Sequence, residues 1–145
     1  MALNLNTSEI IEVFGEHDPT LHEAEAASRW GETDAYKQSN ARTSKYSKSE
    51  WQASQVDGDL IVANFIDAMS RGLVPDSTEA KTAAEAHRLN ITKWFYDCSH
   101  EMHTNLAQMY LADPRFTQYY EDKQAGLAQY VHDSILANAL DHINK

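Results

Sequence analysis

Side chains that can face a helical core recur along this 145-residue chain at the three- and four-residue steps of an α-helix. The clearest series is Ala80, Ala84, His87, Ile91 and Trp94, spaced by four, three, four and three residues. Such spacing places all five side chains on one face of a helix. No segment shows the strict alternation of a half-buried β-strand. The pattern therefore predicts an all-α fold with seven or eight helices.

Capping and breaking residues indicate where these helices begin and end. Ser47 and Glu50 form a capping-box pattern at the start of a long helix, and Gly72 stands where a C-terminal cap belongs. A straight helix over 77–112 would span about 54 Å, more than the roughly 38 Å diameter of a domain this size. We therefore expect a break at 97–99. The predicted helices are 7–14 (capped by Thr7 or Ser8), 19–30, 34–43, 47–70, 77–112 with that break, 114–122 and 125–143.

Composition and charge narrow the class of protein. Hydrophobic residues make up 42% of the chain, which is enough for a real core in one domain spanning 1–145. A net charge of −10 opposes direct binding to nucleic acid or to an anionic membrane. A single cysteine favours a reducing compartment, and the N-terminus lacks a signal-peptide pattern. We expect a cytoplasmic domain without a membrane span.

The stretch WFYDCSHEMH, residues 94–103, gathers most of the candidate chemistry. Beside the expected helix break, Cys98 lies at or just inside a helix N-terminus, where the dipole lowers a thiol pKa from its usual value of about 8.5. The neighbouring aromatic rings raise that pKa by desolvation. The sequence leaves this balance open.

Catalysis and metal binding are both disfavoured by spacing in this stretch. Neither His100 nor His103 lies on the helical face of Cys98, so no base is in place for a cysteine nucleophile. These two histidines are three residues apart, rather than the four of the familiar zinc motif. We expect no enzymatic activity, no metal and no cofactor.

Aromatic residues are abundant, with three Trp, seven Tyr and four Phe. They fit either a well-filled core or a ligand cavity lined with rings, and the core is the simpler interpretation. His87, on its apolar stripe, is by itself more typical of a core histidine than of a site.

Six stretches resemble the TipAS antibiotic-recognition domain, the effector module of TipA-type regulators in the MerR family. They are FGEHDP (14–19), RWGETDAYKQS (29–39), AEAHR (84–88), WFYDCSHEMH (94–103), YLADPRFTQYY (110–120) and SILANAL (134–140). The resemblance implies a globin-like helical bundle with a mobile N-terminal lid over 1–46 and a helical core over 47–145. It also implies a hydrophobic cleft that captures thiopeptides or other bulky apolar antibiotics, for resistance or for transcriptional signalling.

The resemblance further implies site residues. Cys98 corresponds to the cysteine that attacks a dehydroalanine of the thiopeptide and becomes covalently attached. Beside it we expect Trp94, Ile91 and Met102, with His87 as a polar contact. The lid and opposing wall are expected to contribute Trp30, Tyr36 and Trp51.

Two other functions remain open at this point. One is a reversible binding module for a small molecule or a partner helix that does not use the thiol. The other is a haem or tetrapyrrole binder, suggested only by the globin-like architecture. The winged helix-turn-helix and coiled coil of full-length regulators have no counterpart in this sequence. We therefore expect either a free-standing sequestering protein or a piece of a longer regulator.

Overall fold

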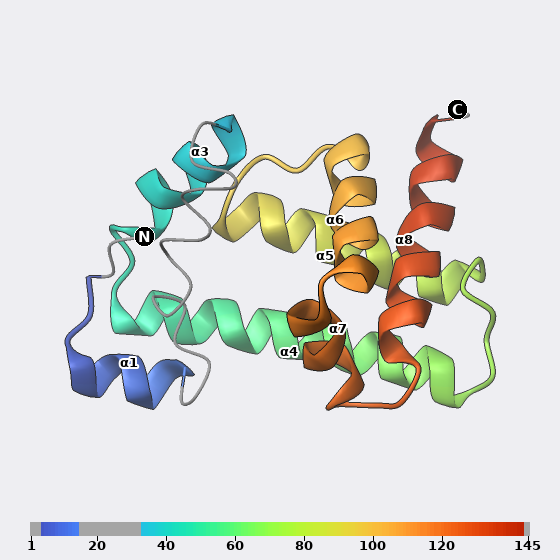
Figure 1. Ribbon diagram of the computed structural model, residues 1–145, viewed down its shortest axis with the longest axis horizontal. Coiled ribbons are helices and arrows are strands. Elements are labelled where there is room, and N and C mark those ends of the chain that lie inside the picture. The colour runs from blue at the N-terminus through green and yellow to red at the C-terminus, as the bar shows by residue number, and fades with distance from the viewer. Residues whose placement is uncertain (1–3, 15–32, 144–145) are drawn as a thin grey trace. The chain divides into compact units, whose positions relative to one another are not determined.

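Helices are the only regular secondary structure in the described part of the chain (Figure 1). A computed structural model describes residues 4–14 and 33–143, which form seven α-helices and no strand. The helices are α1 (Thr7–Phe14), α3 (Asp34–Thr43), α4 (Lys48–Ser70), α5 (Thr78–Trp94), α6 (His100–Ala112), α7 (Pro114–Glu121) and α8 (Leu127–Ile143). This confirms the all-α prediction. The helix predicted for 19–30 lies outside the described residues.

Most of the predicted caps are present. The Ser47 N–H donates to Glu50 Oε1 at 3.1 Å, and the Glu50 N–H donates to Ser47 Oγ at 3.3 Å, which completes the capping box of α4. The same reciprocal pair joins Asn6 and Glu9 ahead of α1, at 3.1 and 2.8 Å. The expected cap at Thr7 or Ser8 is therefore wrong, because the Asn6 side chain supplies it.

Gly72 ends α4 in the left-handed conformation, with φ +73°. Its N–H donates to the Met69 carbonyl at 3.0 Å, and the Leu73 N–H donates to the Ala68 carbonyl at 3.1 Å. This pair of bonds is the Schellman motif, which favours glycine because other residues are strained at positive φ. The predicted C-terminal cap is confirmed.

The chain divides into two compact units, each described here by itself. The first contains the described residues of 1–57 together with 91–97. The second contains 58–90 and 98–145, so that α4 and α5 each contribute residues to both units. The expected division into a lid over 1–46 and a core over 47–145 concerns mobility on binding, and it stays a prediction.

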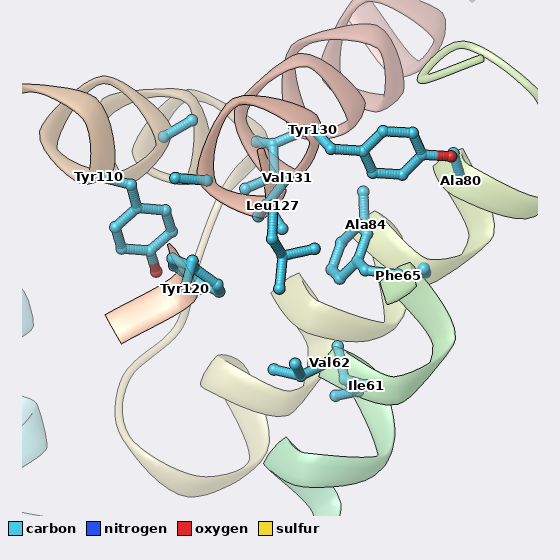
Figure 2. Close-up of a cluster of buried hydrophobic side chains, with 14 of the residues drawn as sticks. Ile61, Val62, Phe65, Ala80, Ala84, Tyr110, Tyr120, Leu127, Tyr130 and Val131 are labelled. Atoms are coloured by element: carbon cyan, nitrogen blue, oxygen red, sulfur yellow. The ribbon is translucent and has the colours of Figure 1, made fainter. Parts of the chain in front are cut away.

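The second unit has a core drawn from α4, α5, α6, α7 and α8. Phe65, Leu127 and Ile135 have no exposed surface, and the small Ala80 and Ala84 let α5 approach them. Figure 2 shows Phe65, Leu127 and Ala84 gathered in this cluster. Burial of each large side chain stabilises the fold by about 1.5–3 kcal/mol.

The first unit has a smaller aromatic core. Trp51 is 3% exposed and packs with Val13 and Tyr46, while Trp94 and Phe95 cover them partly. Tyr46 contacts Trp51 edge-on, with ring centroids 5.5 Å apart, and Trp94 edge-on at 5.7 Å. Tyr46, Trp51 and Trp94 thus pack against one another as core residues, the simpler of the two interpretations of the aromatic content.

Two apolar residues of α4 that belong to its helical pattern are largely exposed, Val56 at 66% and Leu60 at 63%. Among the described residues, no helix combines the length and apolar character needed to cross a membrane.

Candidate functional site

Cys98 lies in the predicted break between α5 and α6. Helix α5 ends at Trp94, and α6 begins after Ser99, whose side chain accepts a hydrogen bond from the Met102 N–H at 3.1 Å. Cys98 therefore precedes the N-cap and is not inside the first turn. Its Sγ donates to the Ser99 carbonyl at 3.6 Å, and only 3% of the residue is exposed.

Arg88 ties the Cys98 backbone to helix α5. Its Nη1 donates to the Cys98 carbonyl oxygen at 2.7 Å. Its Nε and Nη2 donate to Glu85 Oε1 and Oε2 at 2.9 and 2.7 Å, a bidentate pair on the same helix. The Arg88 hydrogen bonds lower the pKa of the Glu85 carboxyl to about 2. The Arg88 guanidinium is therefore held in one orientation between the Glu85 carboxylate, which is ionised at neutral pH, and the Cys98 carbonyl oxygen.

Burial decides whether the pKa of the Cys98 thiol is lowered or raised, a question that the sequence left open. Desolvation raises the pKa of Cys98 to about 11, and Glu85 raises it further while Arg88 opposes the change. About one molecule in ten thousand then carries a thiolate at pH 7. Before any ligand arrives, this cysteine is a protected thiol rather than an activated nucleophile.

The half-buried His87 is paired with the fully buried His103. Its Nδ1 lies 2.8 Å from Nε2 of His103, and the two rings stack with centroids 5.0 Å apart. Phe65 and Tyr110 also contact the His87 ring. Desolvation lowers the pKa of His87 to about 4, and that of the fully buried His103 to about 3. Both rings are neutral at pH 7 because their pKa values lie well below it, and their hydrogen bond joins the N–H of one ring to the lone pair of the other.

In the first unit, helix α3 holds the segment that leads to Cys98. Arg42 Nη1 donates to the Thr92 carbonyl at 2.6 Å, and its Nη2 forms an ion pair with Asp97 at 3.1 Å. The Asp97 N–H donates to Gln38 Oε1 at 2.7 Å. Sequence reasoning missed Arg42 and Gln38, because basic and polar residues on a polar helix ordinarily indicate only a solvated face.

The Trp94 end of α5 is also fixed within the first unit. The Trp94 indole N–H donates to Asp57 Oδ2 at 3.0 Å, and Lys93 donates to the same oxygen at 3.1 Å. The Tyr46 hydroxyl donates to the Trp94 carbonyl oxygen. Trp94 therefore has a structural role in this unit, and Tyr46 is a further residue that sequence reasoning missed.

The predicted site residues fall into both units. Cys98, His87 and Met102 belong to the second unit, and Ile91, Trp94, Trp51 and Tyr36 belong to the first. Within the first, Trp51 and Trp94 meet at Tyr46, and the Tyr36 N–H donates to the Thr33 side chain that caps α3. Trp30 lies outside the described residues. That these eight residues line one cleft stays a prediction.

A known protein family matches most of this helical chain. The family model of the TipAS antibiotic-recognition domain matches residues 22–138. The chain belongs to this family. The likeness also confirms the globin-like all-α class that the resemblance implied.

The relatives are transcriptional regulators. The chain is 46% identical over 142 residues to the HTH-type transcriptional activator TipA of Streptomyces coelicolor and to that of Streptomyces lividans. Each alignment covers 98% of this chain and 56% of the relative. The HTH-type transcriptional activator mta of Bacillus subtilis is 32% identical over 95 residues, covering 66% of this chain and 36% of that protein. The chain thus spans about half the length of the TipA relatives.

Two solved structures are similar. One is TipAS of Streptomyces lividans in complex with nosiheptide, from a thiopeptide antibiotic multidrug resistance system, with a TM-score of 0.90 and 45% identity. That match covers 97% of this chain and 99% of the other. The second is the antibiotic binding domain of a TipA-class multidrug resistance transcriptional regulator, with a TM-score of 0.59 and 44% identity over 63% of this chain and 98% of that one.

Proposed function

We propose that this chain recognises thiopeptide antibiotics and captures them through Cys98. The observation that carries the proposal is the likeness to TipAS with nosiheptide, at 45% identity over 97% of this chain. At that identity, we infer that this chain shares a binding surface for thiopeptides with TipAS. The position of Cys98 at a helix break, with its backbone held by Arg88, supports its role as the attachment point.

The chemistry is an addition that needs no leaving group. The Cys98 thiol loses its proton to solvent, and the sulfur forms a bond to the β-carbon of a dehydroalanine in the antibiotic. The π electrons of the alkene move to the α-carbon, which then takes a proton from water. The product is a thioether, and one adduct per chain is enough to sequester a drug or to signal its presence.

Burial of the thiol makes reversible binding the first stage of capture. With 3% of Cys98 exposed and its pKa raised to about 11, an unbound chain is protected against stray electrophiles. The bound antibiotic has to open access to Sγ before the bond forms. The lid expected over 1–46 is the segment we assign to that change.

A second function rests on the same burial. A chain that binds antibiotics reversibly, and leaves Cys98 as a core residue, is favoured by the low exposure of the sulfur. In either case the chain acts as a cytoplasmic effector domain rather than as an enzyme, and a DNA-binding segment of a longer regulator would supply any contact with nucleic acid.

Calorimetric titration and thermal unfolding with nosiheptide test the binding proposal. We expect a rise in melting temperature for both the wild type and Cys98→Ala, because specific binding stabilises the folded state. After gel filtration in denaturant, only the wild type should retain the drug. A thiopeptide pre-reacted with a small thiol is the matched control ligand, and it should bind both chains reversibly. Absence of a thermal shift with thiopeptides would refute antibiotic recognition itself.

A further inference from the structure

Three potential metal ligands converge in the second unit. Glu85 on α5, His100 on α6 and His142 on α8 each offer one ligand atom, and these atoms all lie within 4.8 Å of one another. No other group of three or more such residues meets that limit in 4–14 and 33–143. We propose that Glu85, His100 and His142 form a binding site for Zn²⁺ or a similar divalent transition-metal ion.

The geometry is close to that of a metal site. His100 Nε2 lies 3.9 Å from Glu85 Oε1, and the rings of His100 and His142 stack with centroids 4.2 Å apart. Zinc bonds of about 2.0–2.2 Å to nitrogen and oxygen place tetrahedral ligands roughly 3.3–3.5 Å apart. His100 Nε2 and Glu85 Oε1 therefore have to approach by about half an ångström, and no pair by more than about 1.5 Å. His142, near the end of α8, is exposed to solvent.

Neighbouring groups orient two of the three ligands. His142 Nδ1 donates to the Asn138 carbonyl at 2.8 Å, which leaves the lone pair of Nε2 for an ion. Ligating histidines usually donate their other ring N–H in this way. Arg88 holds the Glu85 carboxylate from one side, and Asn138 Nδ2 donates to Oε1 at 3.1 Å. A metal ion at Oε1 would take the place of the Asn138 amide.

The third ligand has an unused nitrogen. His100 Nδ1 is buried and has no hydrogen-bond partner among the described residues. His103 Nδ1, outside the cluster, is likewise buried without a partner in the described part of the chain. Nε2, which lies 3.9 Å from Glu85 Oε1, is the His100 nitrogen available to an ion.

The site opens onto a surface groove. A cavity of about 500 Å³ is lined by residues of α5 and α8, among them Glu85, Asn138 and His142. Lys81, also in the lining, is neutralised by Asp141 at 2.6 Å, as Arg88 is by Glu85. The local positive charges are thus already paired. Glu85 and His142 are open to an ion from this groove, and water can fill the fourth position of the ion.

The ligand types select the ion. Two imidazoles and one carboxylate suit zinc, copper or nickel, whereas magnesium and calcium prefer oxygen ligands alone. The ion would join three helices, α5, α6 and α8. The neighbouring histidines of the HEMH stretch do not act together, since His103 is bonded to His87 and only His100 faces this cluster.

Calorimetric titration of the untagged, chelator-treated chain with ZnCl₂ tests the site. We expect one ion per chain and a higher melting temperature with zinc than with magnesium. His142→Ala should weaken zinc binding on the order of tenfold or more. Because His142 is exposed, this variant should fold, which circular dichroism checks. His132→Ala, on the same helix but outside the cluster, is the matched control and should bind as the wild type does.

Cobalt substitution identifies the ligand atoms. The visible spectrum of the Co²⁺ form should lack thiolate charge-transfer absorption, because Cys98 is not a ligand. Zinc binding as tight in His142→Ala and His100→Ala as in the wild type would overturn the proposal. So would a thiolate band with cobalt, or the absence of stoichiometric zinc binding to the wild type. None of these measurements involves an antibiotic, so they stand apart from the test of the proposed function.

Discussion

Mild acid should destabilise this protein through the His87–His103 pair. Both rings are neutral in the folded state, with pKa values of about 4 and about 3, compared with 6.5 for an ordinary histidine. The unfolded chain therefore binds more protons than the folded one below pH 6.5. Stability is fully present above that pH and is lost as the pH falls toward 4. Arg88, Glu85 and His100 are the charged or titratable groups that act on His103 besides His87.

The size of the effect follows from the two pKa values. At pH 5 an unfolded histidine is almost fully protonated, whereas the folded His87 is protonated in about one molecule in ten. Proton linkage then costs about 2 kcal/mol for each ring between pH 8 and pH 5, or about 4 kcal/mol for the pair. Glu85 does not contribute in this window. Its pKa is lowered from 4.5 to about 2, so its stabilisation is present above pH 4.5 and is lost at more acidic values.

Urea unfolding followed by far-UV circular dichroism, at steps from pH 8 to pH 5, measures the loss. His87→Leu/His103→Leu replaces both partners by apolar groups, and its unfolding free energy should change about 4 kcal/mol less over this range. His132→Gln removes one histidine but leaves the buried pair, so it should follow the wild type. A wild-type unfolding free energy that stays constant down to pH 5, or an equal slope in the double variant, would refute the reasoning.

Two further predictions concern the fold. Phe65→Ala removes a fully buried ring and should lower the unfolding free energy by about 3–5 kcal/mol in urea titrations; a loss below about 1 kcal/mol would contradict the core described for the second unit. Gly72→Ala should cost about 1 kcal/mol because φ is +73°. Gly58→Ala, inside α4 with nothing within 4 Å of the added carbon, should instead stabilise by roughly 0.5–1 kcal/mol. Equal effects at the two glycines, measured by the same titrations, would show that backbone conformation does not decide their cost.

Local signals made much of the fold predictable. The Ser47–Glu50 box, the cap at Gly72 and the break before α6 each depend on residues within a few positions of one another. The cap of α1 was assigned to the wrong residue because Asn6, Thr7 and Ser8 are all good N-cap types in a row. Propensity alone does not choose among them.

The interactions around the candidate site were not predictable in the same way. His87 meets His103 across 16 positions, Asn138 meets Glu85 across 53, and Arg42 meets Asp97 across 55. These contacts depend on how helices pack, and periodicity gives a face for each helix but not its partner. The exposure of Val56 and Leu60 has the same origin, since an apolar residue on α4 is buried only where another element covers it.

The most direct test of the central claim is intact-protein mass spectrometry after incubation with nosiheptide. Attachment through Cys98 predicts a single species heavier than the wild-type chain by one antibiotic, stable under denaturing conditions, and no such species for Cys98→Ala. Peptide mapping should place the added mass on the segment that contains Cys98. An adduct of the same mass on Cys98→Ala, or an unmodified wild-type chain that nonetheless binds the drug, would contradict covalent capture by this thiol.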